Sequence, residues 1–223
     1  MKNRITRFVE KNDYKLLLVF TLIFLIVPVF FQKGFIRNFI TFSALTFVFI
    51  QSIFIINRNR NYNWLILVFF LVLFATWVEI LVKDNVYVSL IRLLLYMVFF
   101  ISTIISLVKF IVRTEKVNLN VIVVAVVIYL LIGILGGSAA MSLQVSYPGA
   151  FHFSNPQDTI GFPEMLYFAF ITMTTVGYGD ITPAISEIRT FAYLLAVTGQ
   201  LYLAIIIALI VGKYVSHQQT SRN

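Results

Sequence analysis

The sequence predicts an all-α integral membrane protein with six transmembrane helices. Its 223 residues are 60% hydrophobic, and the mean hydropathy is +0.94. Apolar runs recur along the chain, each near the length of about 20 residues that a helix needs to cross a bilayer. Short polar segments such as NRNRNYN, residues 57–63, separate these runs. Segments this short are typical of tight turns between antiparallel helices, not of linkers between domains.

The expected transmembrane helices follow the apolar runs in order. They cover residues 16–32, 39–56, 64–82, 87–112, 119–142 and 188–212. The first run follows a basic segment but lacks a small-residue cleavage site, so we interpret it as a retained helix and not as a signal peptide. A shorter apolar helix over residues 163–174 precedes the last of the six.

Lys and Arg are distributed unevenly between the two ends of these helices. With the N-terminus inside, the inner segments hold Lys2, Arg4, Arg7, Lys11, Lys15, Arg58, Arg60, Lys109, Arg113, Lys116, Lys213 and Arg222. The outer segments hold only Lys33, Arg37, Lys83 and Arg189. Because cytoplasmic segments are enriched in basic residues, we predict a multi-pass protein of the plasma membrane with both termini cytoplasmic.

The stretch TMTTVGYGDITP, residues 172–183, interrupts the apolar sequence before the last predicted helix. Gly177 and Gly179 suit a backbone whose conformations are closed to residues with a Cβ. Such backbone is tolerated at membrane depth only where protein buries it or water surrounds it. Pro163 suits the first turn of a helix, and Glu164 beside it is favoured by the helix dipole. These features predict a half-helix entering from outside and an extended return, which together form a re-entrant loop.

This stretch resembles the signature of tetrameric potassium channels, threonine-x-x-threonine-x-glycine-tyrosine-glycine. The matching residues are Thr172, Thr175, Gly177, Tyr178 and Gly179. The resemblance extends over residues 119–214, where TGQLYLAIIIALIVGKY is similar to the inner, pore-lining helix of bacterial members. It implies a homotetramer in the lipid bilayer, in which a re-entrant pore helix and selectivity filter replace the water shell of K⁺ with carbonyl oxygens.

The resemblance also implies roles for individual residues. Potassium would be coordinated by Thr175, Val176, Gly177 and Tyr178, with Gly179 completing the filter and Asp180 at its outer mouth. Filter support would come from Thr172, Thr174, Tyr167 and Phe168, and the last two stand where the family often has a tryptophan pair. Some members have a glutamate at the position of Ile171 as a partner for the mouth aspartate. Without it, the Tyr167 hydroxyl is a candidate partner of Asp180.

Two domains are expected. Residues 113–223 would form the pore domain, with outer helix, pore helix, filter and inner helix. Residues 1–112 would form an N-terminal tail and a four-helix module that resembles a voltage-sensor domain without gating arginines. In the inner helix, Gly199 lies near the usual gating hinge of the family, and a packing glycine is the alternative.

Arg92 is a single charge within a predicted span. A voltage-sensing helix needs arginines at every third position, whereas residues 95, 98, 101 and 104 are Leu, Val, Ile and Ile. One charge crossing 100 mV gains only about 2.3 kcal/mol, so we expect weak voltage gating or none. We interpret Arg92 as the partner of Glu79 in a structural ion pair. A vestigial sensor and a ligand site are the alternatives.

The composition argues against enzymatic function. The chain has no cysteine and only two separated histidines, and it lacks a phosphate-binding glycine loop. We therefore expect no enzyme, no cofactor other than K⁺ as permeant ion, no nucleic-acid partner and no separate ligand-binding domain. The alternatives to a potassium-selective channel are a nonselective monovalent cation channel and a subunit of a potassium transporter.

Overall fold

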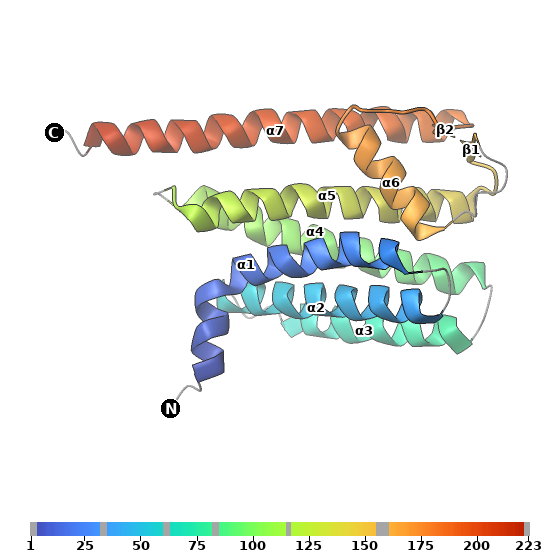
Figure 1. Ribbon diagram of the computed structural model, residues 1–223, viewed down its shortest axis with the longest axis horizontal. Helices are drawn as coiled ribbons and strands as arrows, with labels where there is room; N and C mark the ends of the chain where they lie inside the picture. The colour runs from blue at the N-terminus through green and yellow to red at the C-terminus, as the bar shows by residue number, and fades with distance from the viewer. Residues whose placement is uncertain are drawn as a thin grey trace. The chain divides into compact units, whose positions relative to one another are not determined.

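The computed structural model describes residues 4–31, 35–59, 63–81, 85–114, 117–154 and 161–220. The elements in chain order are α1 (Arg4–Ile26), the 3₁₀ helix η1 (Val27–Phe30), α2 (Phe35–Asn59), α3 (Asn63–Leu81), α4 (Val86–Arg113), α5 (Leu119–Ser146), β1 (Phe151–Phe153), α6 (Phe162–Met173), β2 (Ile181–Pro183) and α7 (Ser186–Thr220) (Figure 1).

Six long helices lie where the sequence predicts transmembrane helices, and α6 lies where it predicts the half-helix. Three described helices are long and apolar enough to cross a membrane, namely Val86–Arg113, Leu119–Ser146 and Ser186–Val215. The chain is therefore a helical membrane protein, while the six crossings remain a prediction. Helix α1 starts well before the predicted span, because hydropathy marks the apolar part of a helix and its hydrogen bonds continue through polar residues.

Several helix ends have a local cause in the sequence. The side chain of Asn118 accepts a hydrogen bond from the backbone N–H of Val121, at 3.1 Å, and so caps the start of α5. Asn85 caps α4 in the same way through the N–H groups of Tyr87 and Val88. Helix α1 ends at Ile26, just before the residue that precedes Pro28, as the steric restriction before proline predicts.

The chain divides into two compact units. One unit comprises residues 1–69 and 103–130, and the other comprises residues 70–102 and 131–223. In the first unit, α1 packs against α2, and the ring of Phe20 stacks on Phe47 with centroids 5.1 Å apart. In the second unit, α6 packs against α7, and a buried apolar cluster lies beside it. The predicted domain boundary at residue 112 stays a prediction.

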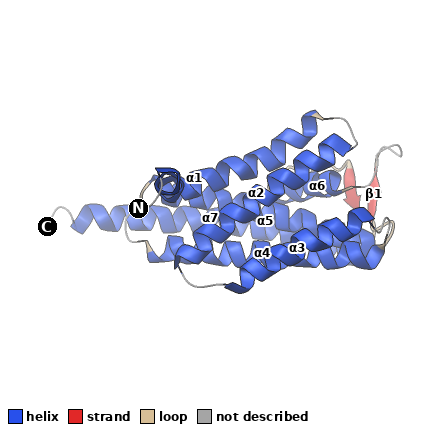
Figure 2. Ribbon diagram, turned by 90° about the horizontal axis from the view of Figure 1, so that it is seen from below, coloured by secondary structure: helices blue, strands red, loops and turns tan. Residues whose placement is uncertain are grey.

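The second unit contains a feature that an all-α prediction leaves out. Strands β1 and β2 form a two-stranded antiparallel sheet in which His152 lies opposite Thr182 (Figure 2). These strands are three residues each, and period-2 alternation is too short there to predict a strand. The sheet joins the loop before α6 to the segment after the expected filter.

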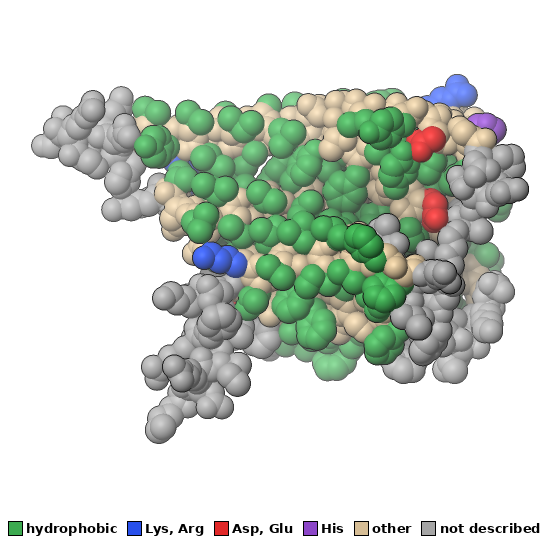
Figure 3. All heavy atoms as spheres, in the orientation of Figure 1, with side chains coloured by type: hydrophobic (Ala, Val, Ile, Leu, Met, Phe, Trp, Pro, Cys, Tyr) green, Lys and Arg blue, Asp and Glu red, His purple; other side chains and the backbone are tan. Residues whose placement is uncertain are grey.

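Helix α7 carries most of its apolar surface outward within the single chain. Hydrophobic side chains recur along the described part of this helix, with polar groups and backbone between them (Figure 3). Large apolar residues on it are exposed, among them Tyr193, Leu194, Val197, Leu201, Ile205, Ile207 and Val211. Side chains of this kind on a membrane helix contact lipid or other protein surfaces, since neither requires polar groups.

Candidate functional site

Helix α6 has the ends that the sequence predicts. Gly161 is its N-cap in an extended conformation, Pro163 lies in its first turn, and Glu164 places a negative charge at the positive end of the helix dipole. The helix ends at Met173, because Thr174 is the C-cap and Thr175 has a φ of 61°. A helix cannot continue through that left-handed conformation.

The backbone beyond α6 alternates in the sign of φ. Thr175, Gly177 and Gly179 have φ values of 61°, 52° and 82°. Among the described residues, Thr175 is the only non-glycine residue with a positive φ. An alternation of this kind is what we expect of a segment whose successive carbonyls point to one side. A left-handed conformation costs a β-branched residue about 1–2 kcal/mol, so Thr175 is a strained position that its surroundings must hold.

The inner end of this segment is tied to α6 by hydrogen bonds. The N–H groups of Val176 and Gly177 both donate to the carbonyl oxygen of Ile171, at 2.9 and 3.1 Å. The hydroxyl of Thr174 donates to the Phe170 carbonyl at 2.7 Å. Ile171 therefore holds residues 176 and 177 through its backbone carbonyl, although its side chain lacks the carboxyl group that some potassium channels have at this position.

The outer end of the segment is tied to α6 by a side chain. The hydroxyl of Tyr167 donates to Asp180 Oδ2 at 2.6 Å, and the N–H of Ile181 donates to Asp180 Oδ1 at 3.1 Å. The hydrogen bond to Asp180 is the main cause that raises the pKa of Tyr167 to about 12, so the phenol stays protonated as a donor. The predicted partner of Asp180 is thus present in the structure.

Helix α5 presents glycines to α6 where the two helices meet. A Cβ at Gly137 would lie 2.9 Å from Leu166 Cα, and a Cβ at Gly133 would overlap the ring of Phe170. A Cβ at Gly136 would lie 2.9 Å from a methyl group of Leu195 on α7. Gly133 and Gly137 thus let α6 lie closer to α5 than alanine would allow, and Gly136 leaves room for Leu195 of α7. These contacts were not predicted, although small residues at spacing three and four are visible in LIGILGGSAA.

Gly199 on α7 is a close-packing glycine. A Cβ there would overlap the Cγ and carbonyl oxygen of Met173, and α7 continues as a helix through this position. The neighbouring Gln200 side chain donates to the same Met173 carbonyl at 3.4 Å, one of the carbonyls that a helix end leaves without an internal partner. The packing interpretation of Gly199 thus has direct support, and the hinge remains a prediction.

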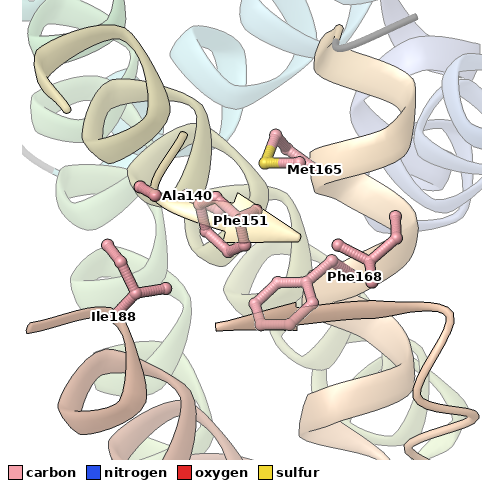
Figure 4. Packing of buried hydrophobic residues seen from close by; sticks show 7 residues of the cluster. Ala140, Phe151, Met165, Phe168 and Ile188 are labelled. Atoms are coloured by element: carbon pink, nitrogen blue, oxygen red, sulfur yellow. The ribbon is translucent and has the colours of Figure 1, made fainter. Parts of the chain in front are cut away.

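Phe168 belongs to a buried cluster behind the filter segment. Its members are Ala140, Ala150, Phe151, Met165, Phe168, Ile181 and Ile188. Phe151 of β1 packs edge-to-face on Phe168, with ring centroids 5.0 Å apart (Figure 4). The aromatic residue expected to support the filter is therefore itself supported by the loop that precedes α6. Thr172, also expected as support, accepts the N–H of Thr175 through its carbonyl at 3.0 Å.

Arg92 lies on α4 in the second unit. Its guanidinium carbon lies 5.7 Å from the ring centroid of Tyr96, in a cation–π arrangement. The Tyr96 hydroxyl is hydrogen-bonded to that of Thr76 at 3.2 Å. The side chain of Glu79, the predicted partner of Arg92, lies outside the described residues. The ion pair therefore remains a prediction.

Comparison with known proteins finds sequence similarity in the region that contains this site. Residues 117–216 match the sequence family described as ion channel. Potassium voltage-gated channel subfamily A member 10 of Mus musculus and that of Homo sapiens are each 35% identical to the chain over 97 residues. The match covers 42% of this chain but only 18% of either relative, so the chain spans a small part of their length. No solved structure matches the chain significantly.

The matched residues hold α5, α6, the filter segment and α7, which are the elements that build the site. The glycine-tyrosine-glycine stretch and the half-helix before it lie inside the matched region. The chain is thus similar over residues 117–216 to the ion channel family, and over 97 residues to voltage-gated potassium channels.

Proposed function

We propose that the chain forms a homotetrameric channel that conducts K⁺ selectively and passively through a filter of residues 175–179. The observation that carries this proposal is the alternating φ of Thr175, Gly177 and Gly179 directly after the C-terminal end of α6. Alternation directs the carbonyls of Thr175, Val176, Gly177 and Tyr178 to one side, where rings of oxygens can substitute for the water shell of K⁺. The negative end of the α6 dipole would favour a cation below the filter.

The exposure of residues 174–180 in a single chain supports the assembly of several chains. Every residue from Thr174 to Asp180 is exposed in one copy. Non-helical backbone at membrane depth requires surrounding protein or a water-filled space, and further copies of the chain would supply both. The exposed apolar face of α7 offers a surface for these copies. The chain carries one filter loop, so four copies are needed to close a ring.

Potassium is preferred over a nonselective permeation pathway because Tyr178 is present and the outer end of the filter is held by Tyr167. The replacement of the family's tryptophan pair by Tyr167 and Phe168 is the feature that favours the nonselective alternative. A potassium transporter subunit is disfavoured, since such proteins usually carry several imperfect filter loops in one chain.

Weak voltage dependence and an orientation with both termini in the cytoplasm complete the proposal. Along α4, Arg92 is followed by apolar residues at the next four positions of a sensor repeat. The basic residues of the chain gather on the predicted inner side, as cytoplasmic segments of plasma-membrane proteins do.

The test is the reversal potential of the purified protein in a planar bilayer with K⁺ on one side and Na⁺ on the other. We expect a value near the potassium equilibrium potential. A value near zero with clear current would replace the proposal with a nonselective channel. No current, together with K⁺ flux into vesicles that depends on a second ion, would favour the transporter subunit.

A pair of glycine variants ties the current to the filter. Gly177→Ala places a Cβ at a φ of 52°, so we expect loss of selectivity although the space around that Cβ is open. Gly212→Ala on α7 is the matched control, because no described atom lies within 4 Å of its Cβ and its φ is helical. The mass of the purified complex, four chains or another number, tests the assembly independently.

A further inference from the structure

The loop before α6 and the segment after the filter are hydrogen-bonded along five residues each. Strands β1 and β2 pair in the middle of this ladder. On either side, the N–H of Ser154 donates to the Asp180 carbonyl and the N–H of Ala184 donates to the Ala150 carbonyl, both at 2.9 Å. We call residues 150–154 and 180–184 the outer ribbon.

One face of the outer ribbon is buried. Phe151 is almost completely buried and packs on Phe168 of α6, and Ile181 belongs to the same cluster. The N–H of Phe151 points away from β2 and donates to the buried side-chain oxygen of Gln144 on α5, at 3.3 Å. The outer ribbon is therefore held to α5 by a hydrogen bond and to α6 by side-chain packing. His152 on its other face is exposed.

Asp180 is held at three of its oxygens. The backbone carbonyl of Asp180 accepts a hydrogen bond from the N–H of Ser154. Its Oδ2 accepts one from the Tyr167 hydroxyl, and its Oδ1 accepts one from the N–H of Ile181. Asp180 directly follows Gly179, the last filter residue with a left-handed φ. The inner end of the filter is tied to Ile171 of α6, so the ribbon acts at the opposite end.

We propose that β1 and the flanking residues Ala150 and Ser154 are the outer clamp of the filter, a backbone support that keeps Asp180 in place and so preserves the filter between Thr175 and Gly179. The proposal rests on the filter function proposed above. Strained backbone persists only where its surroundings over-determine it, and Thr175 is such a residue at the start of the segment that Asp180 ends. Ser154 and Phe151 are positioning residues that act on the filter through Asp180 and Phe168.

The test uses a reversible lock across the outer ribbon. His152 and Thr182 lie opposite each other in a hydrogen-bonded pair, whose Cα atoms are about 5.5 Å apart in such sheets. That spacing falls within the range of about 4.4–6.8 Å that a disulfide accepts. The chain has no cysteine of its own, so the double variant His152→Cys with Thr182→Cys has no competing thiol. Each single variant is the matched control.

The first readout is survival of the K⁺ current after exposure to K⁺-free, Na⁺-containing solution. Removing K⁺ removes the ligand that stabilises the filter. We expect the oxidised double variant to lose current about fivefold more slowly than the reduced one, the factor that roughly one net hydrogen bond provides. Oxidant should leave the single variants unchanged. Unchanged survival in the oxidised double variant, with the disulfide verified by mass, overturns the proposal.

A second readout does not depend on conduction. Hydrogen exchange at residues 175–179, measured by mass spectrometry on the tetramer, should slow on oxidation, while exchange in α7 beyond residue 200 should not. Equal hydrogen exchange at residues 175–179 in the oxidised and reduced double variant would overturn the clamp, even if the chain carries no current. A protein without K⁺-selective current but with lock-dependent exchange would instead overturn the channel function and keep the clamp.

Ser154 offers a backbone test of the same point. Ser154→Pro removes the N–H that bonds the Asp180 carbonyl, whereas Ser154→Ala keeps it. We expect faster current loss and faster filter exchange in the proline variant and unchanged behaviour in the alanine variant. If the proline variant does not assemble, the disulfide lock alone decides.

Discussion

Tyr167 of the pore helix donates its hydroxyl hydrogen to Asp180 Oδ2 at 2.6 Å, thirteen residues further along the chain. This bond closes a loop that contains the whole filter segment, because its two ends flank Thr175 to Gly179. Together with the bonds from Val176 and Gly177 to Ile171, it ties both ends of the filter to one short helix. The filter is therefore positioned by α6, and α6 by the glycines of α5 and α7.

Removing the Tyr167 hydroxyl should shorten the life of the conducting filter. In Tyr167→Phe, Asp180 loses a donor while the ring stays in place. A hydrogen bond of this kind contributes on the order of 1 kcal/mol, so K⁺ current should decline about fivefold faster in K⁺-free solution. Tyr147→Phe, at an exposed tyrosine near the end of α5, is the control and should match the wild type. Equal decline in both variants would contradict the role of this bond.

The Tyr167–Asp180 bond should not respond to pH near neutrality. The hydrogen bond to Asp180 raises the pKa of Tyr167 to about 12. A raised pKa means that the contribution of the neutral phenol is complete below the unfolded pKa of about 10 and is lost as pH rises through about 12. The difference in current survival between wild type and Tyr167→Phe should thus be constant between about pH 6 and 9.

A phenolate absorbance titration checks the same pKa directly. The phenolate absorbance that develops near pH 12 should be smaller in Tyr167→Phe than in the wild type by the contribution of one tyrosine per chain. A titration that is identical in both proteins would rule out the strong hydrogen bond.

The contact between Gly133 and Phe170 predicts a rescue. Gly133→Ala would push on the Phe170 ring, and overpacking of this kind costs roughly 1–3 kcal/mol. We expect a lower melting temperature of the tetramer and a reduced K⁺/Na⁺ permeability ratio. Phe170→Leu removes the ring atoms that collide, so the double variant should recover both properties. The absence of recovery would mean that the glycine serves another purpose.

Gly199 predicts a clash that no side-chain change can relieve. In Gly199→Ala the new methyl group meets the Met173 carbonyl, part of the backbone from which the filter starts. Shortening Met173 to alanine should therefore not restore current, in contrast to the Gly133 pair. Restoration by Met173→Ala would show that only the Met173 side chain, and not its carbonyl, excludes a methyl group at residue 199.

Neutralising Arg92 should leave voltage dependence nearly unchanged. A single charge per chain contributes about 2.3 kcal/mol per 100 mV at most, and less if it does not cross the whole field. The conductance–voltage curve of Arg92→Gln should thus keep the slope of the wild type, and the protein should lose stability with the cation–π contact to Tyr96. A markedly flatter curve would identify Arg92 as a sensor.

The helical membrane class, the approximate places of the long helices and the half-helix before residues 175–179 could be predicted from the sequence. These features have local causes: apolar runs of sufficient length, capping residues, and two glycines that permit a positive φ. The bond between Tyr167 and Asp180 could also be predicted. Ile171 stands where some potassium channels have a glutamate that pairs with the aspartate, so another partner was expected.

The contacts that hold residues 175–180 in place could not be predicted from the sequence, apart from the Tyr167–Asp180 bond. Gly133 and Gly137 of α5 are needed because α6 lies directly against them. Gly199 is needed because it contacts the carbonyl of Met173. The outer ribbon pairs segments about thirty residues apart. Its strands of three residues are too short to show an alternating pattern from which a strand could be predicted. Long-range pairing and close packing depend on which surfaces meet, which a local pattern of residues does not contain.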